Sequence, residues 1–227
     1  MEIFDLGRED YEEVWSLQHK LFNQMVNEKK DKGYVEREYL ILVEHYPVIT
    51  LGKHAKKENI LFPDSMLKEK GIGVFNIERG GDVTYHAPGQ LVVYPLIDLE
   101  RYRLGVKAYV DLLEETIIRL LSQFGIIGKR IEGASGVWIE TFNSDEKKIC
   151  ALGVKCSRYC TMHGLALNVN NDLSGFNMIN PCGFTDRGVT SIAVETGREI
   201  NFDEVKKRFV SVFLSLLEPR IHVPGTF

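Results

Sequence analysis

Helical segments in this chain are few, and several strand-like segments lie between one helix and the next. Apolar side chains recur at helical spacing in residues 9–28, 106–124 and 202–217, which we expect to be helices. The remaining sequence is rich in β-branched and aromatic residues, and it does not alternate regularly between strand and helix. This pattern favours an α+β fold, in which helices pack on a mixed β-sheet.

The expected elements carry recognisable end signals. Gly125 follows the second helix as a stop signal, and Asn201 precedes the third as its N-cap, with Glu204 three residues on. A short turn at residues 46–47 separates the first two expected strands. The expected strands are residues 39–45, 47–52, 73–78, 83–87, 91–99, 135–140, 148–157 and 163–171.

Composition and charge limit the classes of protein to which this chain can belong. The 227 residues fit one domain, 1–227, since no Pro/Gly/Ser-rich linker divides them, although a small C-terminal subdomain could begin near Asn171. The net charge of −4 gives no reason to expect nucleic-acid binding. We expect neither a secretion signal nor a membrane span, because no apolar run approaches the ~20 residues that a span needs. The four cysteines then indicate free thiols in a reducing cytoplasm.

A glycine pair forms the first candidate site. Arg79-Gly80-Gly81 precedes the expected strand 83–87, and paired glycines let a backbone approach a ligand closely. Arg79 and His86 would supply charge and hydrogen bonds at the two ends of this segment. An ordinary glycine hairpin explains the same residues. The spacing matches neither a phosphate-binding P-loop nor a dinucleotide fingerprint.

A second candidate lies between residues 147 and 171. Cys156, Cys160 and His163 could suggest zinc, but their spacing does not fit the usual ligand pairs, so we favour apolar packing for these cysteines. Lys148 and Cys150 are two residues apart and would share one face of a strand. The neighbours of Cys150 are apolar, which predicts a buried, inert thiol.

The third candidate is Cys182, in the stretch "INPCGF". Proline and glycine flank this cysteine, so we expect a turn that exposes the thiol. A nucleophilic cysteine needs a nearby cation or base that lowers its pKa. Lys148, Lys155, His163 and His86 are available for that role, and burial as a packing residue remains the alternative.

Four motifs in a fixed order decide between these interpretations. They are R-G-G-x-V-T-Y-H from residue 79, K-I-x-x-L-G from 148, H-G-L-A-L-N from 163 and P-C-G from 181. With the stretches at 42–61 and 188–192, they resemble the lipoyl(octanoyl) transferase family over residues 38–192. Asp82 and Ala87 stand at positions where relatives often carry Gln and Gly.

The resemblance implies both a fold and a set of site residues. The fold is of the biotin/lipoate protein ligase type, which agrees with the α+β expectation. Cys182 corresponds to the acyl-accepting nucleophile and Lys148 to the residue that lowers its pKa; a slip of one position would exchange Lys148 for Lys147. The residues implied to line the acyl pocket are Arg79, Gly80, Gly81, Asp82, Val83, Thr84, Tyr85, His86, Ala151, Leu152, Gly153, Gly164, Leu165 and Ala166.

The resemblance also implies a reaction without ATP, cofactor or metal. Octanoyl-acyl carrier protein would donate an octanoyl or lipoyl group to a thioester on Cys182. The acceptors would be lysines in lipoyl domains of 2-oxoacid dehydrogenase complexes and in the glycine cleavage H protein. We expect His86 and His163 to shape the pocket rather than act as bases. The alternatives are an ATP-dependent lipoate or biotin ligase, a non-catalytic module that binds an acyl group, and Cys150 as nucleophile.

Overall fold

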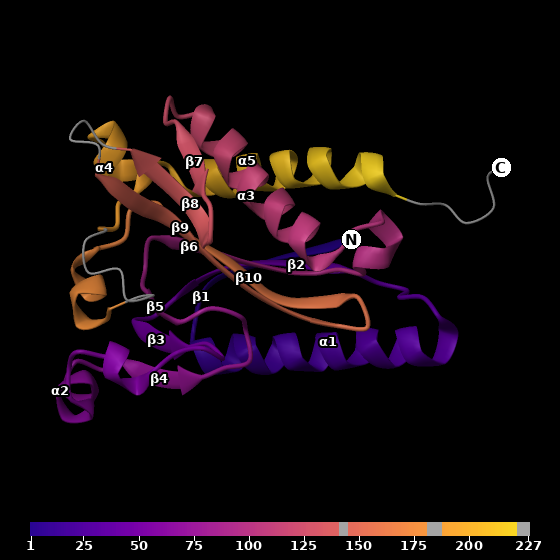
Figure 1. Ribbon diagram of the computed structural model, residues 1–227, viewed down its shortest axis with the longest axis horizontal. Helices are drawn as coiled ribbons and strands as arrows, with labels where there is room; N and C mark the ends of the chain where they lie inside the picture. Colours follow the sequence, from indigo (N-terminus) through magenta and orange to yellow (C-terminus); the bar gives the residue numbers. More distant parts are fainter. Residues whose placement is uncertain (141–144, 181–187, 222–227) are drawn as a thin grey trace.

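The computed structural model describes residues 1–140, 145–180 and 188–221 (Figure 1). Its centre is a seven-stranded sheet in the order β1-β2-β6-β10-β9-β8-β7. The pair β1/β2 is parallel and the other neighbours are antiparallel. The strands are β1 (Glu2–Glu9), β2 (Tyr39–His45), β6 (Gln90–Leu96), β7 (Gly128–Ile131), β8 (Ala134–Glu140), β9 (Glu146–Ser157) and β10 (Cys160–Asn168).

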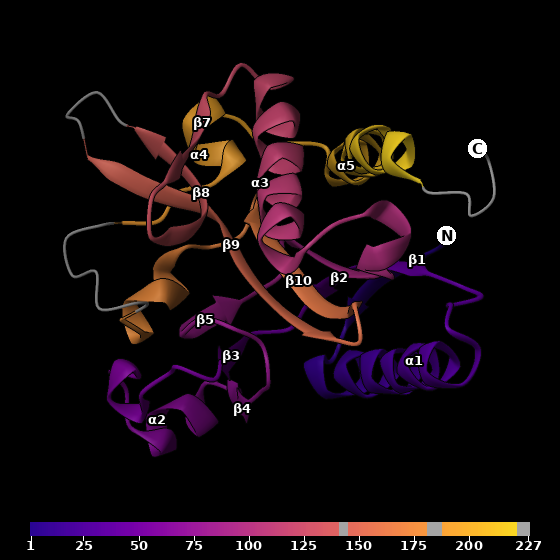
Figure 2. The ribbon, with the colours of Figure 1, turned by 45° about the vertical axis from the view of Figure 1, so that its right-hand side comes forward.

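Helices cover both faces of this sheet (Figures 1 and 2). Along β2, Leu40 and Leu42 join the cluster that contains α3 (Val106–Ser122) and α5 (Phe202–Leu217). The alternate residues Ile41 and Val43 join the cluster that contains α1 (Tyr11–Lys32). Successive side chains of a strand point to opposite faces, so one apolar strand supplies two cores.

A second, three-stranded sheet lies beside the first. Its order is β4 (Gly73–Asn76), β3 (Val48–Leu51), β5 (Val83–His86), with β3 parallel to β4 and antiparallel to β5. The strands β2 and β3 therefore do not form a hairpin, because the turn between them carries the chain from one sheet to the other. The short helices are α2 (Asp64–Glu69), α4 (Ile192–Thr196) and the 3₁₀ turns Lys57–Asn59, Leu99–Tyr102, Ser174–Met178 and Glu218–Arg220.

The α+β expectation is confirmed, and so are the three long helices. The first helix begins at Tyr11, because β1 occupies the chain up to Glu9. The Asn201 side chain caps α5 by accepting a hydrogen bond from the Glu204 backbone N–H at 3.0 Å. In the described part of the chain, no helix is both long and apolar enough to cross a bilayer.

Candidate active site

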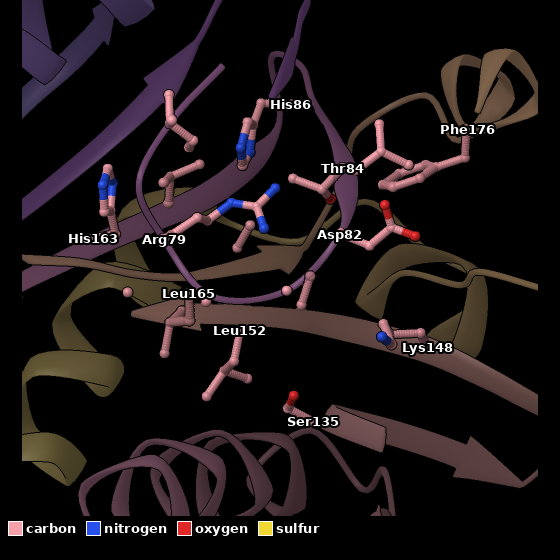
Figure 3. A pocket seen from close by; sticks show the side chains of 18 of the residues that line it. Arg79, Asp82, Thr84, His86, Ser135, Lys148, Leu152, His163, Leu165 and Phe176 are labelled. Carbon is pink, nitrogen blue, oxygen red and sulfur yellow. The ribbon is translucent and has the colours of Figure 1, made fainter. Parts of the chain in front are cut away.

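A cavity of about 590 Å³ lies where the small sheet meets β9 and β10. In Figure 3, Leu152 and Leu165 lie on one side of it and Arg79, Thr84 and His86 on the other. The other apolar residues of its wall are Ile77, Val83, Val92, Ala134, Ala151, Ala166, Phe176 and Val189. The volume is in the range usual for small-molecule sites. Polar and charged side chains line the cavity beside these apolar residues.

Arg79 and two glycines bring the small sheet against the large one. The buried Arg79 guanidinium donates to the Thr50 carbonyl and hydroxyl oxygens at 3.1 and 3.0 Å. The Gly80 N–H donates to the Val154 carbonyl on β9 at 3.0 Å. A Cβ at Gly153 would lie 2.7 Å from the Gly80 carbonyl oxygen and 2.8 Å from Arg79 Cδ, so only glycine fits there. The Arg79 guanidinium therefore helps to build the cavity wall through its bonds to Thr50 on the small sheet.

Lys148 lies at one end of the cavity and His163 at the other (Figure 3). The half-buried Lys148 ammonium sits 4.5 Å from the centre of the Trp138 ring. A Cβ at Gly136 would lie 2.5 Å from the Cys150 carbonyl oxygen, so this glycine lets β8 and β9 approach each other closely beside Lys148. Lys147 is next on the same strand and does not line the cavity.

A charged cluster packs behind the far end of the cavity. His163 is 1% exposed, with Nε2 3.7 Å from a Glu78 oxygen, and Lys155 Nζ lies 3.1 Å from the other oxygen of that carboxylate. The His163 ring and the Lys155 ammonium hold the pKa of Glu78 far below its usual range. Burial lowers the pKa of His163, which favours its neutral form.

His86 and His45 form a second buried group beside the cavity. His45 Nε2 is 2.9 Å from the Tyr94 hydroxyl, and His86 Nδ1 is 2.8 Å from Gln90 Oε1. Burial lowers the pKa of His45 to about 4 and that of His86 to about 3. Both rings are therefore neutral near pH 7, which suits hydrogen-bonding groups of a pocket wall better than a cation site.

The described cysteines are poor nucleophile candidates. Cys150 is fully buried in the core under α3, and burial raises its pKa well above the ordinary thiol range. Burial also raises the pKa of Cys160, to about 12, and that of the half-buried Cys156. Among the residues that the structure describes, no group of three or more His, Cys, Asp or Glu is arranged to hold a metal ion. Cys182 lies outside the described residues.

The structure brings most of the residues named from the sequence to this one cavity. Gly80 and Tyr85 do not line it; Tyr85 packs instead against Gly175 and Phe176. The residues of that set that do line it are Arg79, Gly81, Asp82, Val83, Thr84, His86, Lys148, Ala151, Leu152, Gly153, Gly164, Leu165 and Ala166.

Several polar residues at the site have no expected role in the sequence motifs. Gln90, Asn168 and Ser135 line the cavity, and Trp138 contacts Lys148. Gln90 and Asn168 are polar residues at the ends of otherwise apolar strands, and both are almost fully buried. A polar amide at the end of an apolar strand could have indicated a role for both residues, because a buried amide needs hydrogen-bond partners.

The fold is that of lipoate and biotin protein ligases. A bipartite lipoate protein ligase from Thermoplasma acidophilum has a TM-score of 0.71 at 17% identity, covering 96% of this chain and 83% of that one. Biotin protein ligase from Aquifex aeolicus has a TM-score of 0.51 at 14% identity, covering 96% and 70%. Identities this low establish shared architecture alone.

Sequence comparison narrows the class to a family. The model of the lipoyl protein ligase A/B catalytic domain matches residues 10–214. The octanoyltransferase of Parabacteroides distasonis is 48% identical over 213 residues, covering 93% of this chain and 96% of that protein. The octanoyltransferase of Porphyromonas gingivalis is 51% identical over 210 residues, which are 92% of this chain and 42% of that longer protein. This chain belongs to the lipoyl(octanoyl) transferase family.

Proposed function

We propose that this protein transfers an octanoyl group from acyl carrier protein to a lysine of a lipoyl domain, through a thioester on Cys182. One observation carries the proposal. Lys148, a half-buried cation on the wall of a largely apolar cavity, donates its backbone N–H to the carbonyl of Gly188, the first described residue after 181–187. On the other side, the Asn180 N–H donates to the Asn59 carbonyl, and Asn59 also lines the cavity. Both flanks of the segment that contains Cys182 are therefore bonded to residues of the cavity wall.

The first step exchanges one thioester for another. The Cys182 thiolate attacks the octanoyl carbonyl carbon, a new carbon–sulfur bond forms, and the bond to the carrier's thiol breaks. The departing thiolate takes up a proton. Such an exchange is near energetic balance, so it needs no ATP. A nearby cation such as Lys148 can bring the pKa of a thiol from ~8.5 to within ~3.5–7.5, which makes Cys182 reactive at neutral pH.

The second step converts the thioester to an amide. The ε-amine of the acceptor lysine attacks the carbonyl carbon, the carbon–sulfur bond breaks, and the Cys182 thiolate is regenerated. The amine loses a proton as the amide forms, and Lys148 can accept it once it has passed its own proton to the first leaving group. Amides are more stable than thioesters, so this step draws the reaction forward.

The cavity suits an acyl chain of medium length. Burial of each CH₂ contributes about 0.8 kcal/mol, so an octanoyl chain gains several kcal/mol from a wall lined by Leu152, Leu165 and Ala166. The acceptors we propose are the lipoyl domains of 2-oxoacid dehydrogenase complexes and the glycine cleavage H protein. We infer a cytoplasmic location, because the reactive thiol must stay reduced.

Two alternatives make different demands on the chain. An ATP-dependent ligase would activate a free acid as an adenylate and would not need Cys182. A non-catalytic acyl-binding module would need neither Cys182 nor Lys148. Cys150 is the alternative nucleophile, and its burial and raised pKa count against it.

Intact mass spectrometry tests the proposal directly. After incubation with octanoyl-acyl carrier protein and no ATP, we expect an octanoyl adduct on the wild type and on Cys150→Ser, and none on Cys182→Ser. Adding a lipoyl domain should discharge the adduct and increase the mass of that domain. An adduct that persists in Cys182→Ser, or transfer that strictly requires ATP, would contradict the proposal.

A further inference from the structure

A chain of buried hydrogen bonds runs from the cavity wall to the strand of Lys148. His86 Nδ1 lies 2.8 Å from Gln90 Oε1, and Gln90 Nε2 donates to Asn168 Oδ1 at 2.9 Å. Asn168 Nδ2 then donates to the Thr190 carbonyl at 2.9 Å. The Thr190 N–H donates to the Lys148 carbonyl at 3.0 Å. The chain thus connects three strands to the segment that lies beside Lys148.

The direction of every bond in this chain is determined. The Thr190 carbonyl can only accept, so Asn168 must present its NH₂ to it and its oxygen to Gln90. The oxygen of Asn168 also accepts from Asn171 Nδ2 at 3.2 Å, which fits this orientation. Gln90 Nε2 additionally donates to the Tyr85 carbonyl at 3.2 Å, so its oxygen faces His86. Neutral His86 therefore carries its proton on Nδ1 and leaves a lone pair on Nε2.

The groups in this series of hydrogen bonds are buried. Gln90, Asn168 and Thr190 are at most 4% exposed, and His86 is 6% exposed. Water cannot readily replace a missing partner at such positions, so the loss of one donor leaves buried groups unpaired. Asn168 connects Gln90 in the cavity wall to the Thr190 carbonyl through two hydrogen bonds.

We infer that Asn168 is a positioning residue, which holds residues 188–190 against β9 and thereby fixes the placement of Lys148 relative to the chain that follows Cys182. The inference rests on the proposed role of Lys148. Gly188 and Thr190 bond to the N–H and C=O of Lys148 respectively, so their segment runs parallel to β9 at that residue. Asn168 itself contacts neither Lys148 nor the reacting atoms and acts through Thr190.

The sequence offers a matched control two residues away. Asn170 also clamps a distant segment: its Nδ2 donates to the Ile200 carbonyl at 2.7 Å, and its Oδ1 accepts from the Ile200 N–H at 3.0 Å. Replacement of either asparagine by aspartate keeps the shape and exchanges an NH₂ donor for an oxygen. Asn168→Asp breaks the link to Thr190, whereas Asn170→Asp disturbs only the approach to α5.

The test compares the rate at which iodoacetamide alkylates Cys182 across pH, read on the peptide that contains it. For Asn168→Asp we expect the alkylation rate at pH 7 to fall at least about threefold, the change produced when the pKa of a thiol rises by about half a unit. Lys148→Ala should change the profile in the same direction, and Asn170→Asp should leave it unchanged. A wild-type profile for Asn168→Asp beside a shifted one for Lys148→Ala would overturn the inference.

Hydrogen exchange separates this inference from the proposed function. The amides of Lys148 and Thr190 should exchange faster in Asn168→Asp and at the wild-type rate in Asn170→Asp. If Lys148→Ala leaves the alkylation profile unchanged, the proposed role of Lys148 fails, and the exchange rates alone decide whether Asn168 holds the segment. Gln90→Glu, which removes the donor that faces Asn168, replaces Asn168→Asp if that variant does not fold. Unchanged exchange at Lys148 and Thr190 would contradict the inference.

Discussion

Lys148 Nζ lies 4.5 Å from the centre of the Trp138 ring. The ring cannot turn away, because Trp138 is 2% exposed and its indole N–H donates to the Ala134 carbonyl at 3.1 Å. A cation above an indole face is attracted by about 0.5–2 kcal/mol, more as the pair is desolvated. Trp138 therefore favours one position of the ammonium at the cavity.

Loss of this ring should slow acylation. We expect Trp138→Leu to reduce the rate of octanoyl-adduct formation about tenfold, the effect of losing about 1.4 kcal/mol, and Trp138→Phe to reduce it less. Stopped reactions followed by intact mass give both rates. Ile139→Val is the control for general loosening of β8, and it should react at nearly the wild-type rate. Equal rates for Trp138→Leu and Trp138→Phe would argue against a cation–π contribution.

The close approach of Gly80 to β9 predicts a strong difference between two glycine substitutions. A Cβ at Gly153 would lie 2.7 Å from the Gly80 carbonyl oxygen, whereas a Cβ at Gly80 would lie an ordinary 3.6 Å from the Val154 carbonyl oxygen. We expect Gly153→Ala to lower the free energy of unfolding by about 1–3 kcal/mol, and Gly80→Ala to change it by less than about 0.5 kcal/mol. Urea unfolding measures both values. Similar losses in the two variants would show that the contact is not tight.

The apolar wall predicts that chain-length preference can be altered by filling the cavity. Ala166 is 4% exposed and lines the cavity, so Ala166→Leu should exclude part of an octanoyl chain. We expect the preference for octanoyl over hexanoyl carrier protein, measured as a ratio of kcat/KM values, to fall at least about fourfold, as for one CH₂. Ala108→Leu, on the exposed face of α3, should leave the ratio unchanged. A ratio unaffected by Ala166→Leu would place the acyl chain elsewhere.

The sequence predicted the elements whose burial pattern is local. The expected strand 39–45 coincides with β2, where every residue but Glu44 is buried, and the expected helix 202–217 coincides with α5 and its Asn201 cap. The strands β1 and β7 were missed for a physical reason. The residues of β1 are exposed or half-buried, and β7 is four residues long with two of them charged, so neither shows a strong apolar pattern.

The sequence motifs predicted which residues meet at the candidate site, but they did not predict the contacts between these residues and other parts of the chain. The motif residues Arg79, His86 and Lys148 do meet at one cavity. The contact of Lys148 with Trp138 depends on the pairing of β8 with β9 and on an irregularity in that pairing, which no local pattern encodes. The bond from Asn168 to Thr190 joins residues 22 positions apart, so it emerges only once the chain is folded.

The buried neutral histidines predict how stability depends on pH. The pKa of His45 is about 4 and that of His86 about 3 in the folded protein, both lowered mainly by burial, against about 6.5 in an unfolded chain. Between these values the unfolded state binds more protons than the folded state, so stability rises with pH. Their contribution is complete above pH 6.5 and is lost as pH falls toward 4 and 3. The depressed pKa of Glu78 adds a loss of the same sign, but only below about pH 4.5.

Unfolding by urea between pH 4.5 and 7 isolates the histidines. We expect the free energy of unfolding of the wild type to decline as pH falls below 6.5, with a slope of up to about 1.4 kcal/mol per pH unit for each histidine that stays neutral. His45→Asn removes one such group, so its stability should be lower at pH 7 and should decline less steeply toward pH 4.5. His54→Asn changes an exposed histidine and should keep the wild-type slope. A His45→Asn curve parallel to that of the wild type would mean that His45 is protonated in the folded protein.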